Sequence, residues 1–284
     1  MAAPRRLTGR HPVLVFFGLA LLFSWAIWSP IVAFVRGWSG GAPSPLLESL
    51  HLLGGLGPLL AAVVTLLLRD GRAAVRSWFG ERLRIRGRTG WILLGLAAPF
   101  VLLWVAGLVA GVGWQGPGLL DWWHVGNRWE YLRHRLGYVA AEMLFFGLGE
   151  ESGWRGFALP ELQRRHAALT SALVVGLLWA AWHLPLFSFA QGLSGLSGLA
   201  RAGWFFSILG GAVLLAWLFN ASGGSTLAVA GFHGSLDVAM ASRADQRVMT
   251  LVGAALTLWA VLAAVLLVRW DRRRRASPPR AASV

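Results

Sequence analysis

Three groups of ionisable residues interrupt otherwise apolar stretches of this chain, and their types can together activate water. They are Glu150, Glu151 and Arg155 in GEESGWRG, His183 in WAAWH, and His233 with Asp237 in HGSLD. Ionisable side chains inside membrane spans are costly and usually face the bundle interior or a water-filled cavity. Carboxylates and imidazoles can supply a general base and groups that stabilise an oxyanion. The conjunction predicts hydrolytic chemistry within a membrane.

The two adjacent glutamates are not equivalent on a helix. Glu151 and Arg155 are four residues apart with the acid first, which is the favourable order for an ion pair. Glu150 points about 100° away around the helix axis. We therefore expect Glu151 to be held by Arg155 and Glu150 to be available as a general base. The alternative is that both acids mark the end of a span and lie among lipid headgroups.

The two histidines also have simpler explanations. His183 lies deep in an apolar run, one turn after Trp179, and Pro185 is expected to kink the helix and free the carbonyl of Ala181. Such a histidine could line a polar pocket or only bond a neighbouring helix. His233 and Asp237 are four residues apart and share a face, so they could present to one atom or form a structural pair.

Composition indicates a membrane protein. The chain has 284 residues, 56% hydrophobic and 13% charged, with a mean hydropathy of +0.60. All 26 basic residues are arginine, and the net charge is +14. Because these arginines lie in loops and termini between apolar segments, we expect lipid headgroups and no nucleic acid as partner. With no cysteine, disulfides, thiolate metal sites and cysteine nucleophiles are excluded.

The apolar runs predict an all-α, polytopic bundle of about eight spans, with the polar residues among the later helices. Seven spans are the alternative count. Residues 114–135 mix tryptophan with charge and are expected to lie along the outer interface. The predicted spans are 13–35, 50–68, 91–113, 136–149, 168–190, 203–219, 225–242 and 248–268.

Charge predicts the orientation. With eight spans and a cytoplasmic N-terminus, 19 of the 26 arginines lie on the cytoplasmic side, as the positive-inside rule requires. Both termini are then cytoplasmic, and GEESGWRG lies toward that side. Residues 1–12 are expected to be a cytoplasmic tail, 13–268 one membrane-embedded domain, and 269–284 a basic cytoplasmic tail without structure. The first apolar run is long and lacks a cleavage pattern, which predicts a retained anchor.

The ordered motifs EESGWR, WAAWH and HGSLD resemble those of the CPBP family, the CAAX endoprotease and bacteriocin-processing (Abi) intramembrane proteases. The resemblance covers roughly residues 90 to 245. It implies a protease-like membrane domain that hydrolyses peptide bonds of a membrane-associated substrate, with Glu150 and His183 activating water. By the same resemblance His233 and Asp237 bind the oxyanion, while Glu151 and Arg155 hold the architecture.

Two positions depart from the family pattern. Tryptophan stands at 179 where phenylalanine is frequent, and we expect little consequence. Aspartate stands at 237 where asparagine is frequent, and an ionised aspartate cannot donate to an oxyanion. Asp237 would have to be protonated, orient His233 or bind metal. Glu142 is a further acid in a span and is expected to be structural.

Metal use stays open at the level of sequence. The set that could hold zinc with an open water position is Glu150, His183, His233 and Asp237. The name metalloprotease and a metal-free Glu/His mechanism both fit these residues, and the metal-free one is preferred. The alternative functions are a catalytically silent scaffold or immunity protein of the same fold and, less favoured, a proton-coupled transporter.

Overall fold

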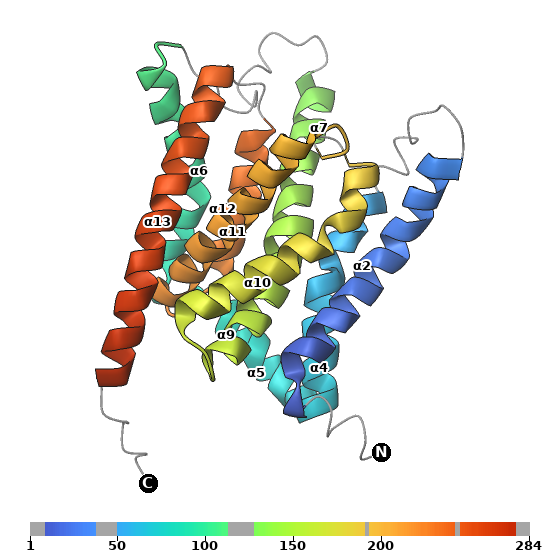
Figure 1. The fold of residues 1–284 in the computed structure, drawn as a ribbon, viewed down its shortest axis with the longest axis vertical. Helices are drawn as coiled ribbons and strands as arrows, with labels where there is room; N and C mark the ends of the chain where they lie inside the picture. Colours follow the sequence, from blue (N-terminus) through green and yellow to red (C-terminus); the bar gives the residue numbers. More distant parts are fainter. Residues whose placement is uncertain (1–8, 38–49, 113–127, 191–192, 242–244, 277–284) are drawn as a thin grey trace.

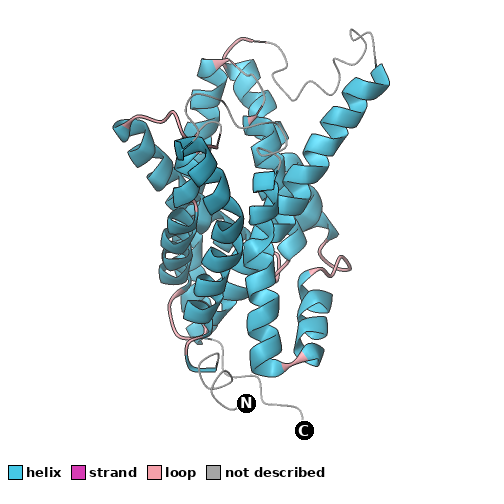
Figure 2. Cartoon of the chain, turned by 90° about the vertical axis from the view of Figure 1, so that its right-hand side faces the viewer, coloured by secondary structure: helices cyan, strands magenta, loops and turns pink. Residues whose placement is uncertain are grey.

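A computed structural model describes residues 9–37, 50–112, 128–190, 193–241 and 245–276. Within these ranges all regular structure is helical, with no strand (Figure 2). In lipid the backbone N–H and C=O groups can be hydrogen-bonded only within a helix or a closed barrel. The apolar runs therefore form helices. The long helices are α2 (Pro12–Gly37), α4 (Gly57–Asp70), α6 (Thr89–Val109), α7 (Arg128–Ala141), α10 (Ala168–Trp182), α11 (Gly198–Ala221), α12 (Thr226–Met240) and α13 (Gln246–Ala276).

Shorter helical elements join these helices. α5 (Arg72–Arg82) lies across one end of the bundle in Figure 1. The remaining short elements are η1 (His51–Leu56), η3 (Glu142–Glu150), α8 (Glu151–Gly153), η4 (Trp154–Ala158), α9 (Leu159–Gln163) and η5 (Leu184–Ser188).

Each of the eight predicted spans corresponds to helix, and six helices are long and apolar enough to cross a membrane. The segments predicted at 136–149 and 225–242 are also helical but are not among these six: 136–149 is divided between α7 and the π-helical η3, and α12 has 15 residues. The protein is therefore an all-α molecule with six candidate membrane spans among the described residues.

Two predicted boundaries need correction. α13 continues to Ala276, so the expectation of an unstructured tail from residue 269 is wrong for 269–276. The predicted interfacial stretch 114–135 falls largely outside the described residues, and its last part is the start of α7.

The apolar run predicts that the helix carrying the two glutamates ends at residue 149. In the structure it continues beyond that residue. Helical elements follow one another without a break from Arg128 to Gln163. The two π-helical stretches, η3 and η4, lie on either side of α8; such wide turns are often found at functional sites. Gly149 and Gly153 allow close packing here, because a Cβ would lie 2.6 Å from the Gly55 carbonyl oxygen and 2.5 Å from Pro58, respectively.

One end of the bundle collects the described ends of the chain. α2 begins and α13 ends at this end, together with α5 and α9 (Figure 1). Asp271 of α13 accepts from the backbone N–H of Ala168 at 2.7 Å, and Arg274 donates to the Gln163 carbonyl at 3.3 Å. We call it the arginine-rich end, because among the described residues the segment leading into α2, α5 with its flanking loops, the loop after α9 and the end of α13 all carry arginines there.

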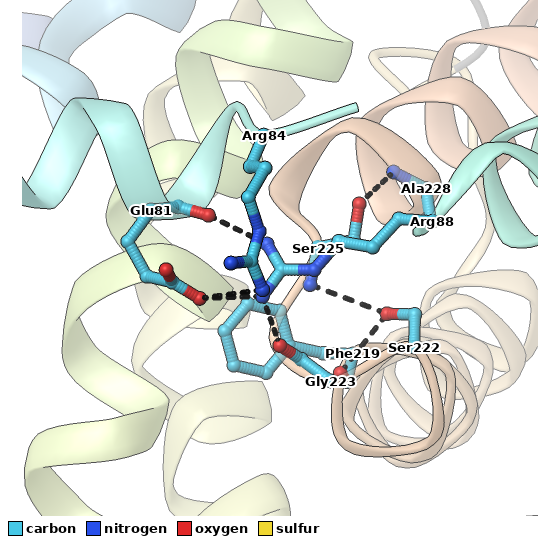
Figure 3. Close-up of polar contacts among 8 residues, drawn as sticks. All are labelled: Glu81, Arg84, Arg88, Phe219, Ser222, Gly223, Ser225 and Ala228. Atoms are coloured by element: carbon cyan, nitrogen blue, oxygen red, sulfur yellow. Dashed lines mark hydrogen bonds and ion pairs between the residues drawn. The ribbon is translucent and has the colours of Figure 1, made fainter. Parts of the chain in front are cut away.

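A buried arginine fastens α12 to this end. Arg88 precedes α6 and is 5% exposed; it donates to the backbone carbonyl of Glu81 at 2.5 Å and to its carboxylate at 2.6 Å. It also donates to the carbonyl of Gly223 in the turn between α11 and α12 (Figure 3). Ser225 then caps α12 by accepting from the N–H of Ala228 at 3.2 Å. The start of the helix that carries His233 is thereby fixed.

Indole groups join the first helix to α10. Pro185 has no N–H, and the chain turns into η5 where Leu186 bonds His183, so the carbonyl of Trp182 is left without its helical partner. Trp25 of α2 donates to that carbonyl at 3.0 Å. The indole of Trp182 in turn donates to Ser24 at 2.7 Å. The end of α10, next to His183, is therefore held by α2.

Candidate active site

Glu150 lies in the interior, not among lipid headgroups. The residue is only 2% exposed. Its carboxylate Oε2 accepts a hydrogen bond from the indole Nε1 of Trp179 at 2.5 Å. Glu151 is fully buried as well. The alternative in which both acids mark the end of a span is therefore wrong, because the helix continues and both carboxylates find buried partners.

The predicted ion pair between Glu151 and Arg155 is confirmed. Arg155 Nη1 donates to Glu151 Oε1 at 2.7 Å, and both side chains are fully buried. The same oxygen of Glu151 lies 2.9 Å from Nδ1 of His233. Glu151 therefore joins the arginine on its own helix to an imidazole on α12, a contact that the sequence reasoning missed because the two residues are far apart in the chain.

Trp179 contacts four of the charged or imidazole groups in this interior, namely Glu150, His183, His233 and Arg155. Besides its bond to Glu150, its ring lies 5.3 Å from the His233 ring and 5.5 Å from the His183 ring, centroid to centroid. The guanidinium carbon of Arg155 lies 4.5 Å from the centroid of its ring. Phenylalanine has no N–H to donate, so tryptophan at 179 adds a contact to Glu150 that phenylalanine could not make, and the expectation that it has little consequence stays a prediction.

His183 ends α10 and has a defined hydrogen-bond partner. Its Nδ1 lies 2.8 Å from the backbone carbonyl oxygen of Trp179, an acceptor only. Nδ1 must therefore carry the proton, which leaves the lone pair on Nε2. The ring lies between Trp182 and Trp204, with centroids at 4.9 and 5.4 Å. The structure thus leaves His183 with one ring nitrogen able to accept a proton.

His233 and Asp237 share a face of α12, as their spacing predicts. Nε2 of His233 is 3.5 Å from Oδ2 of Asp237, while Nδ1 faces Glu151. An imidazole can donate from both nitrogens only when it is protonated. The Asp237 side chain is 34% exposed, against 9% for that of His233. Asp237 was left with three possible roles: donating to the oxyanion when protonated, orienting His233 or binding metal. The contact with Nε2 of His233 supports the second role.

The described residues do not provide a zinc site. They contain no group of three or more His, Cys, Asp or Glu side chains placed to hold a metal ion. Both ring nitrogens of His233 face carboxylates, Nδ1 of His183 faces a carbonyl, and Glu150 accepts from an indole. The candidate set of Glu150, His183, His233 and Asp237 is therefore not arranged as a metal site.

Glu142 packs against α12, the helix that carries His233 and Asp237. It is 8% exposed at the start of η3, and its backbone carbonyl lies 3.3 Å from where a Cβ of Gly234 on α12 would be. Its structural role stays a prediction.

The similarity of this chain to known proteins lies in the region that contains the candidate site. Residues 132–239 match the family described as type II CAAX prenyl endopeptidase Rce1-like. A segment of 37 residues is 43% identical to CAAX prenyl protease 2 of the archaeon Methanococcus maripaludis. That segment covers 13% of this chain and 14% of the relative. The matched range contains every residue of the site described above. Residues 132–239 of this chain are therefore a domain of the Rce1-like type II CAAX prenyl endopeptidase family, a family of hydrolases.

Proposed function

We propose that this protein is an intramembrane endopeptidase that hydrolyses a peptide bond of a membrane-associated substrate. The observation that carries the proposal is the buried carboxylate of Glu150, which accepts a 2.5 Å hydrogen bond from Trp179 and makes no ion pair with Arg155. A buried acid that is positioned but not neutralised by its neighbouring arginine can accept a proton during a reaction. Its place in a domain of a peptidase family supports the same function.

In the proposed first step a water molecule lies between Glu150 and His183. Because Nδ1 of His183 donates to the Trp179 carbonyl, Nε2 can accept one hydrogen of that water and orient it. Glu150 removes the other proton as the water oxygen attacks the carbonyl carbon of the substrate. Glu150 then returns this proton to the amine nitrogen as the carbon–nitrogen bond breaks.

The oxyanion formed by this attack needs a donor. In the proposal His233 supplies it from Nε2, the nitrogen that lies 3.5 Å from Asp237, while Glu151 holds Nδ1 at 2.9 Å. A protonated His233 can keep its bond to Glu151 and still donate from Nε2. Asp237 then orients and stabilises the imidazolium, and Glu151 and Arg155 hold the ring in place.

The test replaces Glu150 by glutamine, which keeps the shape of the side chain and removes the base. We expect Glu150→Gln to lower cleavage by about 10²–10⁴-fold, the usual contribution of general acid–base catalysis. Membrane peptides that accumulate in cells with the variant are identified by mass spectrometry, synthesised and incubated with purified protein in detergent. The two readouts give the substrate and the rate together.

The matched control is Glu161→Gln, an acid on the same helical stretch that pairs with Arg69 at 2.9 Å outside the site. It should leave cleavage unchanged. Full cleavage by Glu150→Gln would show that the base is assigned wrongly. If wild type and variant accumulate the same peptides and neither cleaves them, the chain is a silent scaffold of this fold and the proposal fails.

A further inference from the structure

His183 is held by one hydrogen bond and by three aromatic rings. The bond joins its Nδ1 to the carbonyl oxygen of Trp179 at 2.8 Å. The ring centroids of Trp182, Trp204 and Trp179 lie 4.9, 5.4 and 5.5 Å from that of the imidazole. Trp179 and Trp182 belong to α10, the helix that leads into His183, whereas Trp204 belongs to α11. Of these three rings, Trp204 is therefore the one that holds the imidazole from another helix.

The close packing of α10 on α11 sets the position of Trp204. A Cβ on Gly176 of α10 would lie 2.9 Å from Cβ of Ala212 and 3.0 Å from Cδ2 of Leu209 on α11, so glycine lets the two helices approach closely. His183 is seven residues after Gly176, and Trp204 is eight before Ala212, about two turns in each helix. The two helices are therefore antiparallel, and their closest approach brings the indole of Trp204 beside the imidazole.

The same indole packs on η5, the short element that follows His183. The rings of Trp204 and Phe187 lie 4.8 Å apart with an interplanar angle of 88°. Arg201, one turn before Trp204 on α11, has its guanidinium carbon 5.7 Å from the centroid of the Phe187 ring. Edge-to-face and cation–π contacts depend on orientation. Trp204 therefore holds the chain on both sides of the turn from α10 into η5.

One hydrogen bond does not fix the imidazole of His183 by itself. The ring can still tilt about the line from Nδ1 to the carbonyl oxygen of Trp179, and tilting moves Nε2. In the proposed reaction Nε2 accepts a hydrogen of the attacking water, so the direction of its lone pair decides whether the water is aligned. The indole of Trp204, inclined at 70° to the imidazole, limits this tilt.

We propose that Trp204 is a positioning residue, which holds the imidazole of His183 in the orientation in which Nε2 accepts a hydrogen from water. It acts through His183 and does not touch the reacting atoms. The inference rests on the proposed function, because it assigns Trp204 to the water-orienting step. Trp204 lies between the second and third motifs of the sequence and belongs to neither, so spacing within a motif gives no sign of it.

The kinetic test is Trp204→Leu, which removes the ring and keeps an apolar side chain. We expect kcat for the peptide identified above to fall about 10- to 100-fold, as for a displaced catalytic group, with KM nearly unchanged. Trp204→Phe restores an aromatic ring and should recover most of the rate. The matched control is Trp217→Leu on the same helix, whose ring packs on Trp91 of α6 and Trp259 of α13 at 6.3 and 6.0 Å, not on the site. It should leave kcat unchanged.

A second measurement needs no catalysis. The full chain is labelled with ¹⁵N-histidine and purified in detergent, and the imidazole nitrogens are observed by NMR, with the His183 signals assigned by their absence in His183→Gln. In the wild type and in Trp217→Leu we expect one form of His183, with the proton on Nδ1. In Trp204→Leu we expect this form to exchange with one protonated on Nε2, because a tilting ring breaks its bond to the carbonyl part of the time.

A rise in KM at unchanged kcat would overturn the inference, because Trp204 would then contact the substrate. An equal fall in kcat for Trp217→Leu, or a single Nδ1-protonated form of His183 in Trp204→Leu, would also overturn it. If Trp204→Leu does not elute as a monodisperse protein, Trp204→Met takes its place with the same expectations. Should the wild type cleave no peptide, the proposed function fails, and the NMR result alone decides whether Trp204 holds His183.

Discussion

Two buried arginines of this molecule have opposite hydrogen-bond environments. Arg88 is 5% exposed, and it donates to two backbone carbonyls and to a carboxylate that is itself half exposed (Figure 3). Arg155 is fully buried and donates to a single carboxylate oxygen. Among the described residues its Nε and Nη2 have no hydrogen-bond partner, nor does Oε2 of its partner Glu151.

The difference separates a structural clamp from the interior that we propose to be reactive. A buried polar group without a partner costs free energy, and such groups are retained where function needs them or where water is bound. Arg88 is surrounded by acceptors and fixes a turn. Around Arg155 the acceptors are shared, since one oxygen of Glu151 serves both the arginine and His233. Spare donors and acceptors beside Glu150 are what a site that binds water and a peptide requires.

The largest expected effect comes from removing each arginine in turn. Arg155→Leu leaves the fully buried carboxylate of Glu151 without its cation, and breaking a buried pair costs about 3–5 kcal/mol. Arg88→Leu leaves the Glu81 carboxylate, which is 49% exposed, free to bind water. The loss of stability then comes only from the two backbone carbonyls that lose their donor, and we expect it to be about 1–3 kcal/mol. Urea-unfolding midpoints of the purified proteins in detergent compare the two. An equal or larger loss for Arg88→Leu would reverse the comparison.

The next effect concerns Asp237 and cleavage. Asp237→Ala removes the carboxylate next to His233, and loss of a group that supports an oxyanion donor lowers cleavage by about 10²–10³-fold. Asp237→Asn provides an amide that can itself donate, so it should cleave at least as well as the wild type. Rates on the identified peptide measure both. A loss in Asp237→Asn as deep as in Asp237→Ala would show that the negative charge is required.

Trp179→Phe tests the contact that holds Glu150. It removes one N–H and keeps most of the ring that packs on His183, His233 and Arg155. A hydrogen bond to a charged group contributes about 1.5–3 kcal/mol, so we expect cleavage to fall about 10- to 100-fold with a smaller change in stability. The measurement is cleavage rate beside thermal unfolding.

Trp78→Phe is the matched control, since its indole also donates across the bundle, to the carbonyl of Gly156 at the arginine-rich end. It should lower stability and leave the rate nearly unchanged. Equal rates for the wild type and Trp179→Phe would mean that Glu150 is positioned by its surroundings alone.

Much of the fold could be predicted from the sequence, because lipid restricts apolar runs to helices and eight such runs are visible. The ion pair of Glu151 with Arg155 and the shared face of His233 and Asp237 were also predictable, since each depends on contacts within one helix. Local spacing is sufficient for these features.

Contacts between helices could not be predicted in the same way. The indole of Trp179 reaches Glu150 across 29 positions of sequence, and His233 reaches Glu151 across 82. Charge alone predicts the membrane surface and hence an end of the span at residue 149, whereas these charges have partners inside the bundle. The zinc set failed for a related reason, since both ring nitrogens of His233 face carboxylates and the described residues contain no group of three or more such side chains placed to hold a metal ion.

The smallest expected effect comes from changing Glu81, the acidic partner of Arg88, and it sharpens the comparison of the two arginines. Glu81→Gln removes the charge that Arg88 contacts at 2.6 Å but keeps the backbone carbonyl of residue 81 and that of Gly223 as acceptors. Pairs with a half-exposed member contribute about 0.2–1 kcal/mol, so the unfolding midpoint should shift only slightly. Cleavage should be unchanged, because the start of α12 keeps its backbone anchor. A loss of cleavage in Glu81→Gln at unchanged stability would show that the clamp acts on the site through α12, and the two arginine regions could then no longer be treated as independent.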